Sequence, residues 1–347
     1  MSEAKVSIKN LYKIFGRKPA DMVAHVENGV SKADLLENYG HILGLNNVSI
    51  DIAPRAIQVV MGLSGSGKST LIRHINRLIE PTAGQVVVDG DDVLQMDEAQ
   101  LRDFRRKKAS MVFQKFALLP HRSVIDNVAY GLKIQGVDAG QYTNTAQHWI
   151  ERVGLSGFEN NFPAQLSGGM QQRVGLARAL ATDSELLLMD EAFSALDPLI
   201  RSDMQDILLG LQDELHKTII FITHDLDEAL KIGDNITILR DGAVVQNGRP
   251  QDIVMSPADD YVTDFIKDIN KARVLQVSSV MGKEQGIKGP SLEANTLLED
   301  AMQSVIDSKA NGAVVTKNGK KVGTASLAAM VKAIARAEKT GDTETYR

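Results

Sequence analysis

The segment from residue 62 to residue 69 constrains the fold of this chain more than any other part of its 347-residue sequence. It reads Gly-Leu-Ser-Gly-Ser-Gly-Lys-Ser and matches the pattern G-x-x-x-x-G-K-[ST]. An apolar run, Val59-Val60-Met61, precedes it, and an apolar-periodic helical stretch follows from Leu71. Glycines let such a loop curl until backbone N–H groups and a helix N-terminus face the same point. The pattern therefore predicts a phosphate-binding loop between a strand and a helix.

Two side chains of this loop predict what it binds. Lys68 supplies a point charge suited to the terminal phosphates of a nucleotide, and the Ser69 hydroxyl can ligate Mg²⁺. A loop of this kind fits a kinase, a GTPase or a motor as well as other ATPases. The loop alone therefore leaves the class of enzyme open.

Two further strands are expected to deliver polar groups to the same sheet edge. The apolar run 186–189 is followed by Asp190-Glu191, and the run 218–223 is followed by His224. Open α/β sheets bind their ligands at the carboxyl ends of the strands. We expect Asp190 to hold Mg²⁺ directly or through water, Glu191 to polarise the attacking water, and His224 to bond the γ-phosphate and orient that water.

Residues 1–270 are predicted to form an α/β domain. Buried runs such as 186–189 and 219–222 lack polar alternation, as is typical of parallel strands covered on both faces. Asp241-Gly242 lies between two short strands and predicts a tight hairpin, so some antiparallel sheet is expected too. We expect helices at 69–78 and 171–181, and strands at 6–8, 58–61, 85–88, 110–113, 185–189, 218–223, 236–239 and 243–246.

Residues 16–43 differ from the rest of this domain. They form a polar stretch that opens with Gly16-Arg17-Lys18-Pro19. The sequence Ser31-Lys32-Ala33-Asp34 carries the signal of a helix N-terminus, with Ser31 as the capping residue. We therefore expect a surface insertion with a helix in its second half.

The charge of the chain changes near Lys271. The formal net charge of the whole chain is -5. Residues 271–347, by contrast, carry 12 Lys and Arg against 8 Asp and Glu. This step predicts a domain boundary there, followed by a small second domain. Its expected elements are a strand at 274–277, a helix at 297–309, a hairpin around Asn318-Gly319 and a helix at 326–337.

Composition excludes several classes of protein. Hydrophobic residues make up 43% of the chain and charged residues 24%, which is ordinary for a globular protein. No run of 18 apolar residues and no charged-then-apolar leader is present, so we expect neither a membrane span nor a secretory signal. With 0 cysteines there is no disulfide framework and no thiolate metal site. The acidic balance argues against a nucleic-acid partner.

One segment separates the enzyme classes that the loop leaves open. Leu166-Ser167-Gly168-Gly169-Met170-Gln171-Gln172-Arg173 resembles the signature motif of the ABC family of ATPases, with Met170 where the commonest signature has glutamine. Other marks of that family stand in order around it: an aromatic residue before the loop (Phe15), the Q-loop glutamine (Gln114), the D-loop (Ser194-Ala195-Leu196-Asp197) and the switch histidine (His224). The resemblance covers residues 1–270. It implies a P-loop NTPase fold with an antiparallel β subdomain and a helical signature subdomain.

The resemblance also implies a reaction and a set of site residues. ATP would be hydrolysed with Mg²⁺ between two copies of the chain arranged head to tail, each lending its signature to the nucleotide on the other. Catalysis is expected from Glu191, His224 and Gln114, and Mg²⁺ binding from Ser69, Gln114 and Asp190. ATP is expected on Phe15, Gly62, Ser64, Gly65, Ser66, Gly67, Lys68, Ser69 and Thr70. The signature contact across the dimer is expected from Ser167, Gly168, Gly169 and Gln171, with Asp197 in the D-loop.

A narrower resemblance concerns the transported solute. Residues 189–201, together with 166–170 and the insertion at 16–43, are similar to the ATPase subunits of importers for glycine betaine, choline, proline betaine and other quaternary amines. Such subunits work with transmembrane permease subunits and a separate substrate-binding protein, at the cytoplasmic face of the bacterial inner membrane. The apolar stretch after Gln114, residues 116–124, is where the family receives a helix of its membrane partner.

The tail resembles a single CBS motif, a small α+β regulatory unit that related subunits commonly carry as a pair. Lys317, Lys320 and Lys321 flank its hairpin, with Lys309 nearby. They form either a solvated hairpin tip or a contact for an anionic lipid or ligand.

Three other functions remain open at this point. The chain could serve an importer of another small solute, such as the amino acids histidine or proline. It could be an ABC ATPase that acts on DNA or ribosomes, but those usually carry two ATPase units, a long coiled coil or a basic surface. A phosphate-loop kinase would leave the signature segment and Asp197 without a role.

Overall fold

The computed structural model describes residues 4–114, 116–284 and 286–335. The chain divides into two compact units, Met1–Gly248 and Arg249–Arg347. The described part of the chain contains no helix with the length and apolar character of a transmembrane span.

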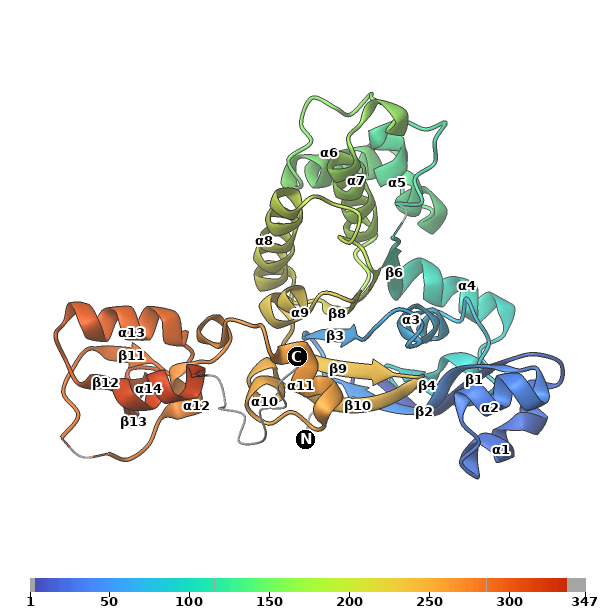
Figure 1. The fold of residues 1–347 in the computed structure, drawn as a ribbon. Helices are drawn as coiled ribbons and strands as arrows, with labels where there is room; N and C mark the ends of the chain where they lie inside the picture. Colours follow the sequence, from blue (N-terminus) through green and yellow to red (C-terminus); the bar gives the residue numbers. More distant parts are fainter. Residues whose placement is uncertain (1–3, 115, 285, 336–347) are drawn as a thin grey trace, which may run out of the picture. The chain divides into compact units, whose positions relative to one another are not determined.

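The larger unit is built on a six-stranded sheet with the strand order β10-β9-β3-β8-β7-β6 (Figure 1). Every residue of β3, β7 and β8 is buried, as the unbroken apolar runs predict. Neighbouring strands are parallel except for β10, which returns antiparallel to β9. The strands are β3 (Ile57–Met61), β6 (Ala109–Val112), β7 (Leu186–Asp190), β8 (Thr218–Thr223), β9 (Asn235–Arg240) and β10 (Ala243–Gly248).

The turn between β9 and β10 confirms the predicted hairpin. Asp241 and Gly242 both have positive φ, 50° and 84°, as a two-residue turn matched to the strand twist requires. The predicted strands of this sheet agree with the observed bounds within two residues.

A second sheet is antiparallel, with the order β2-β1-β4-β5. It consists of β1 (Val6–Phe15), β2 (Ile42–Ile52), β4 (Ala83–Val88) and β5 (Asp91–Asp92). The prediction of a strand at 6–8 is too short, and β2 was not predicted. Asn46-Asn47 interrupts the apolar alternation of β2, and register shifts between β1 and β2 absorb the irregularity.

Helices complete the larger unit. α5, α6 and α7 pack on one another and form a helical part, drawn in green in Figure 1. The predicted helix at 171–181 is the body of α7, and the one predicted at 69–78 is α3. The α/β fold with an antiparallel β part and a helical part is therefore confirmed. The helices beyond residue 43 are α3 (Lys68–Ile75), η2 (Val93–Gln95), α4 (Glu98–Lys107), α5 (Val124–Gln135), α6 (Ala139–Arg152), η3 (Pro163–Gln165), α7 (Gly168–Ala181), α8 (Pro198–Leu215) and α9 (Leu226–Ile232).

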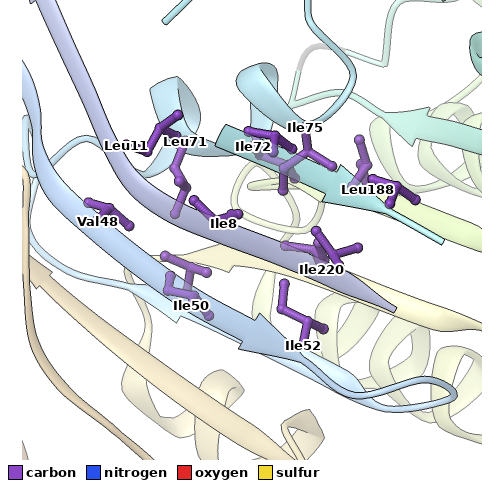
Figure 2. Close-up of a cluster of buried hydrophobic side chains, with 14 of the residues drawn as sticks. Ile8, Leu11, Val48, Ile50, Ile52, Leu71, Ile72, Ile75, Leu188 and Ile220 are labelled. Carbon is purple, nitrogen blue, oxygen red and sulfur yellow. The ribbon is translucent and has the colours of Figure 1, made fainter. Parts of the chain in front are cut away.

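The main hydrophobic core holds the two sheets and α3 together (Figure 2). Ile8 of β1 and Ile50 of β2 approach from the antiparallel sheet, and Leu188 and Ile220 from the parallel sheet. Ile72 of α3 is fully buried between them. The helix that follows the phosphate loop is thus fixed by packing on both sides.

The insertion at 16–43 contains η1 (Pro19–Met22), α1 (Val23–Glu27) and α2 (Lys32–Tyr39). Ser31 caps α2, because its Oγ accepts a hydrogen bond of 3.1 Å from the backbone N–H of Asp34. This confirms the predicted helix start. Val26 and Leu35 are buried with Tyr12, Ile14 and Leu43 in a separate small core. The insertion is therefore packed on β1 and β2.

The smaller unit contains a three-stranded sheet with the order β11-β12-β13. β11 pairs parallel to β12, and β12 forms the predicted hairpin with β13 through Asn318-Gly319. Its elements are α10 (Pro250–Met255), α11 (Asp260–Ile266), η4 (Lys271–Arg273), α12 (Val277–Val280), β11 (Ser291–Glu293), α13 (Leu298–Asp307), β12 (Gly312–Lys317), β13 (Lys320–Ser326) and α14 (Leu327–Ile334).

The predictions for the tail are confirmed in part. α13 and α14 correspond to the expected helices, although residues 336 and 337 of the second lie outside the described part of the chain. The strand predicted at 274–277 is wrong, because Val277 begins the helix α12. Leu275 and Val277 are fully buried, and a short apolar run fits a buried helical segment as well as a strand.

Truncation of Leu35 is expected to loosen the insertion. Leu35 is fully buried, whereas the neighbouring Leu36 is 53% exposed on the same helix. We expect Leu35→Ala to lower the free energy of local opening of α2 by about 2–4 kcal/mol, measured by native-state hydrogen exchange of its amides. The control Leu36→Ala should change it by less than about 0.5 kcal/mol. Equal effects of the two changes would mean that the insertion has no core of its own.

Candidate active site

The phosphate loop joins β3 to α3 and is pressed against the backbone of neighbouring segments. Gly62 has φ 150°, and a Cβ atom there would lie 2.2 Å from the carbonyl oxygen of Leu239. Gly67 has φ 102°, and a Cβ atom there would lie 2.5 Å from the carbonyl oxygen of Gly44. Both the backbone conformation and the space exclude any other residue at these two positions. The backbone conformation of the loop between β3 and α3 is therefore tightly restricted.

Lys68 is curled into this loop. Its Nζ donates hydrogen bonds to the carbonyl oxygens of Gly62 (2.8 Å) and Leu63 (3.1 Å), and the side chain is only 5% exposed. Burial lowers the pKa of the Lys68 ammonium, while the nearby carboxylates of Glu191 and Asp190 act in the opposite direction. The loop thus holds a buried cation among backbone dipoles, and this arrangement suits an anionic ligand.

Ser69 and Asp190 are brought together, as the sequence predicts. The Ser69 hydroxyl donates to Oδ1 of Asp190 at 2.7 Å, and Nη2 of Arg73 donates to Oδ2 of the same carboxylate at 3.0 Å. Asp190 is the last residue of β7 and is almost fully buried. A hydroxyl and a carboxylate oxygen side by side are hard donors of the kind that Mg²⁺ prefers, so this pair fits the metal that the sequence implies.

Glu191 lies at the centre of the polar groups at this sheet edge. Nε2 of Gln114 donates to its Oε2 at 2.9 Å, Nζ of Lys68 lies 3.9 Å from its Oε1, and Nδ1 of His224 lies 3.8 Å from its Oε2. Its φ of 47° is in the left-handed region, and its N–H donates to the carbonyl oxygen of Ile222 in β8. A glutamate held in such a conformation stores strain, which is typical of functional sites.

The remaining residues predicted on the loop lie with Lys68 and Ser69. Ser64 and Gly65 form its exposed tip, and Thr70 lies in the first turn of α3. Oγ of Ser66 is buried and has no hydrogen-bond partner in the described part of the chain. A buried hydroxyl without a partner, in the same loop as a buried ammonium, is consistent with a site completed by a phosphate group.

The signature segment lies in the helical part of the unit. Oγ of Ser167 caps α7 by accepting from the N–H of Met170 at 3.3 Å, and the amide of Gln171 donates to two carbonyl oxygens of the preceding turn. A Cβ atom at Gly169 would lie 2.6 Å from Cγ2 of Ile200. The structure therefore joins Lys68, Ser69, Asp190, Glu191, Gln114 and His224 into one site, while Ser167, Gly168, Gly169 and Gln171 belong to another part of the same unit.

Phe15 is the last residue of β1, and Asp197 immediately precedes α8. Phe15 ends β1 with 39% of its surface exposed, and Nζ of Lys13 lies 4.9 Å from the centre of its ring. Asp197 caps α8 by accepting from the backbone N–H of Ile200 at 3.1 Å. An exposed ring at this position is available for stacking on a flat ligand.

Two residues of this region were not predicted from the sequence. Arg73 orients Asp190 from α3, and Lys32 of the insertion donates to the carbonyl oxygen of Gly65 in the loop. Arg73 lies four residues after Ser69 and so on the same helix face, which is a signal that could have identified it. No sequence pattern indicates the contact of Lys32.

The fold and this site define a phosphate-loop nucleotide-binding protein. Residues 45–194 match the family model described as ABC transporter. The glycine betaine transport ATP-binding protein OpuAA of Bacillus subtilis is 48% identical over 330 residues, which cover 93% of this chain and 79% of the relative. The trimethylamine N-oxide transport system ATP-binding protein TmoW of Pelagibacter ubique is 42% identical over 341 residues, which cover 98% of this chain and 100% of the relative.

A solved structure agrees with this relationship. It is the dimeric post-hydrolysis state of an ATP-binding cassette bound to ADP and Pi, 32% identical, with a TM-score of 0.60 and coverage of 70% of this chain and 98% of that one. The chain belongs to the ABC transporter family of ATP-binding proteins. Its reaction is the hydrolysis of ATP in the presence of Mg²⁺.

Removal of the buried cation should weaken nucleotide binding. We expect Lys68→Ala to raise the Kd for ATP about ten- to a hundredfold, because a charge-assisted contact to phosphate is lost. The exposed Lys9 provides a matched control, and Lys9→Ala should bind ATP as the wild type does. Binding is measured by fluorescence of a labelled ATP analogue, with thermal unfolding as a check of the fold. Unchanged affinity of a folded Lys68→Ala protein would contradict the role of this lysine.

Proposed function

We propose that this chain is the ATP-hydrolysing subunit that energises an importer of quaternary amines such as glycine betaine, choline or proline betaine. The convergence of Gln114, Lys68 and His224 on Glu191 is the observation that carries the hydrolytic part of this proposal. The solute class is supported by relatives named for glycine betaine and trimethylamine N-oxide transport, whose similarity extends over more than nine-tenths of the chain.

We infer that Glu191 is the general base of the reaction. Its carboxylate accepts a proton from the attacking water, and Gln114 and His224, which face the same carboxylate, orient that water. Lys68 and the loop N–H groups bind the phosphates. Ser69 and Asp190 would hold Mg²⁺, which when bound neutralises charge on the phosphate oxygens. The hydrogen bond of Gln114 in the structure is to Glu191, so its expected role toward the metal remains a prediction.

We propose that a second copy of the chain completes the site. Ser167 caps a helix of 14 residues whose first turn contains two glycines, and such a helix start is a second place where backbone N–H groups can meet an anion. In a head-to-tail homodimer, Ser167, Gly168, Gly169 and Gln171 of one copy would contact the ATP bound at Lys68 of the other. Asp197, at the start of α8, would lie at the same interface.

We propose that the transmembrane permease binds to the surface next to Gln114. A groove of about 340 Å³ lies between the six-stranded sheet and the helical part, and its walls include exposed or half-buried apolar side chains. Arg178 of α7 donates to the carbonyl oxygens of Ala117 (2.7 Å) and Phe116 (3.1 Å), both of which have positive φ. The apolar lining suits a helix of a transmembrane permease. The apolar residues concerned are Leu78, Met111, Phe113, Ala117, Leu119 and Tyr130.

The wider assembly follows from this proposal. A separate substrate-binding protein would select the solute, no nucleic acid would take part, and the subunit would be peripheral to the cytoplasmic face of the bacterial inner membrane. Within the chain, we propose residues 1–270 as the ATP-binding domain and 271–347 as a single CBS-like regulatory domain. The compact units of the structure divide earlier, after Gly248, so α10 and α11 lie in the smaller unit. The order β11-α13-β12-β13-α14 supports the second part, and residues 336–347 lie outside the described structure.

Replacement of the proposed base should separate binding from hydrolysis. We expect Glu191→Gln to retain ATP and to lower the rate of hydrolysis at least about a hundredfold, because water activation is lost while the phosphate contacts remain. The variant should accumulate as an ATP-bound dimer in size-exclusion chromatography with light scattering. Adding Ser167→Ala should return it to the monomer. Normal hydrolysis by Glu191→Gln would show that another group is the base.

Uptake in cells tests the solute class. In cells that lack this chain but keep its membrane partners, we expect the wild type to restore uptake of radiolabelled glycine betaine and Glu191→Gln to leave it at background. Histidine uptake, measured in the same cells, should be the same with and without the chain. Restored histidine uptake with no change for glycine betaine would instead favour an amino-acid importer.

A further inference from the structure

A lysine of the insertion at 16–43 contacts the phosphate loop. Nζ of Lys32 donates a hydrogen bond of 3.0 Å to the carbonyl oxygen of Gly65 and lies 3.8 Å from Oδ1 of Asp241. Gly65 belongs to the exposed tip of the loop, where the neighbouring Leu63 is 58% exposed. The Lys32 side chain is itself 35% exposed, so its charge is partly solvated.

The loop is held by two lysines at different carbonyl groups. Lys68 binds the carbonyl oxygens of Gly62 and Leu63 from within the buried part of the loop. Nζ of Lys32 donates a hydrogen bond to the carbonyl oxygen of Gly65 at the tip of the loop. A Cβ atom at Gly65 would meet no atom of the described residues within 4 Å, so the backbone there faces open space on that side. Lys32 thus supplies a side-chain hydrogen bond to an exposed part of the loop, in addition to the backbone bond from the Ser66 N–H to the carbonyl oxygen of Leu63.

The β9–β10 turn supports the loop from a second direction. The N–H of Gly242 donates to the carbonyl oxygen of Ser66 at 3.1 Å, and its own carbonyl accepts from Asn46 of β2 at 2.8 Å. Asp241 in the same turn is the carboxylate that faces Lys32. The ammonium of Lys32 therefore lies between the loop tip and a turn that is already tied to the loop.

Lys32 lies at the start of a helix that is packed in the small core of the insertion. It starts α2, whose Leu35 is fully buried in the small core of the insertion. The His41 ring lies between the carbonyl oxygens of Tyr39 (2.6 Å) and Arg17 (2.8 Å), one near each end of the insertion. A Cβ atom at Gly16 would lie 2.2 Å from this ring, so the ring packs directly against the residue after Phe15.

We propose that Lys32 is a positioning residue of the nucleotide site, which restrains the phosphate-loop tip and adds a positive charge that favours ATP over less charged nucleotides. This inference rests on the proposed function, because it takes the loop as the ATP site. Partly exposed charges contribute little and are screened by salt, so the effect is modest and greatest at low ionic strength. The insertion is in this way part of the nucleotide site.

The test compares Lys32→Met with Lys18→Met, an exposed lysine of the same insertion. Kd values for ATP, ADP and adenosine are measured with purified full-length protein at low and high salt. We expect Lys32→Met to raise the Kd for ATP about three- to tenfold at low salt. The Kd for ADP should rise by a smaller factor, and the Kd for adenosine should not change. High salt should remove most of the difference. Lys32→Arg should restore binding, and Lys18→Met should match the wild type.

Steady-state kinetics give an independent readout. Lys32→Met should raise KM for ATP and leave kcat unchanged, since the base Glu191 and its partners are not altered. If Lys32→Met binds ATP as tightly as the wild type at low salt, or if it weakens adenosine and ATP binding equally, the positioning role is wrong while the ATP site stands. If the wild type binds no ATP, the proposed function fails together with this inference.

Discussion

The close packing of the phosphate-loop backbone against its neighbours is the constraint on which the rest of the structure depends. At Gly62 and Gly67 the chain passes carbonyl groups of β9 and β2 with no room for a side chain. β2 belongs to the antiparallel sheet and β9 to the parallel one, so the loop is formed only when both sheets are in place. The core around Ile72 of α3 holds them at the required separation. The conformation of the loop therefore depends on the packing of both sheets.

The site itself is a balance of buried charge. Asp190 and Glu191 leave β7 side by side, and each is matched by cations and donors from other elements: Arg73 and Ser69 for the first, Lys68 and Gln114 for the second. Two adjacent carboxylates would repel each other if left unpaired in a buried place. Their different partners also separate their roles, because the Asp190 side chain is enclosed whereas the Glu191 side chain keeps 17% of its surface exposed.

Much of the fold and the site could be predicted because the sequence carries them locally. The loop glycines, the unbroken apolar strands and the polar residues that follow β7 and β8 all appear as short patterns. β2 was missed because Asn46-Asn47 interrupts its alternation, and the strand at 274–277 was wrong because a short apolar run does not distinguish strand from buried helix. Arg73 and Lys32 act on partners 117 and 33 residues away, and contacts of that kind arise from tertiary structure.

Arg178 links α7 to the segment that borders the proposed docking groove. Near one end of this helix, its guanidinium is bound to the carbonyl groups of Phe116 and Ala117, which belong to the strained segment bordering the groove. Ser167 stands at the other end, 11 residues away, or about 16 Å along the axis at the usual rise per residue. The same helix therefore connects the segment that borders the groove with the helix start where Ser167 stands.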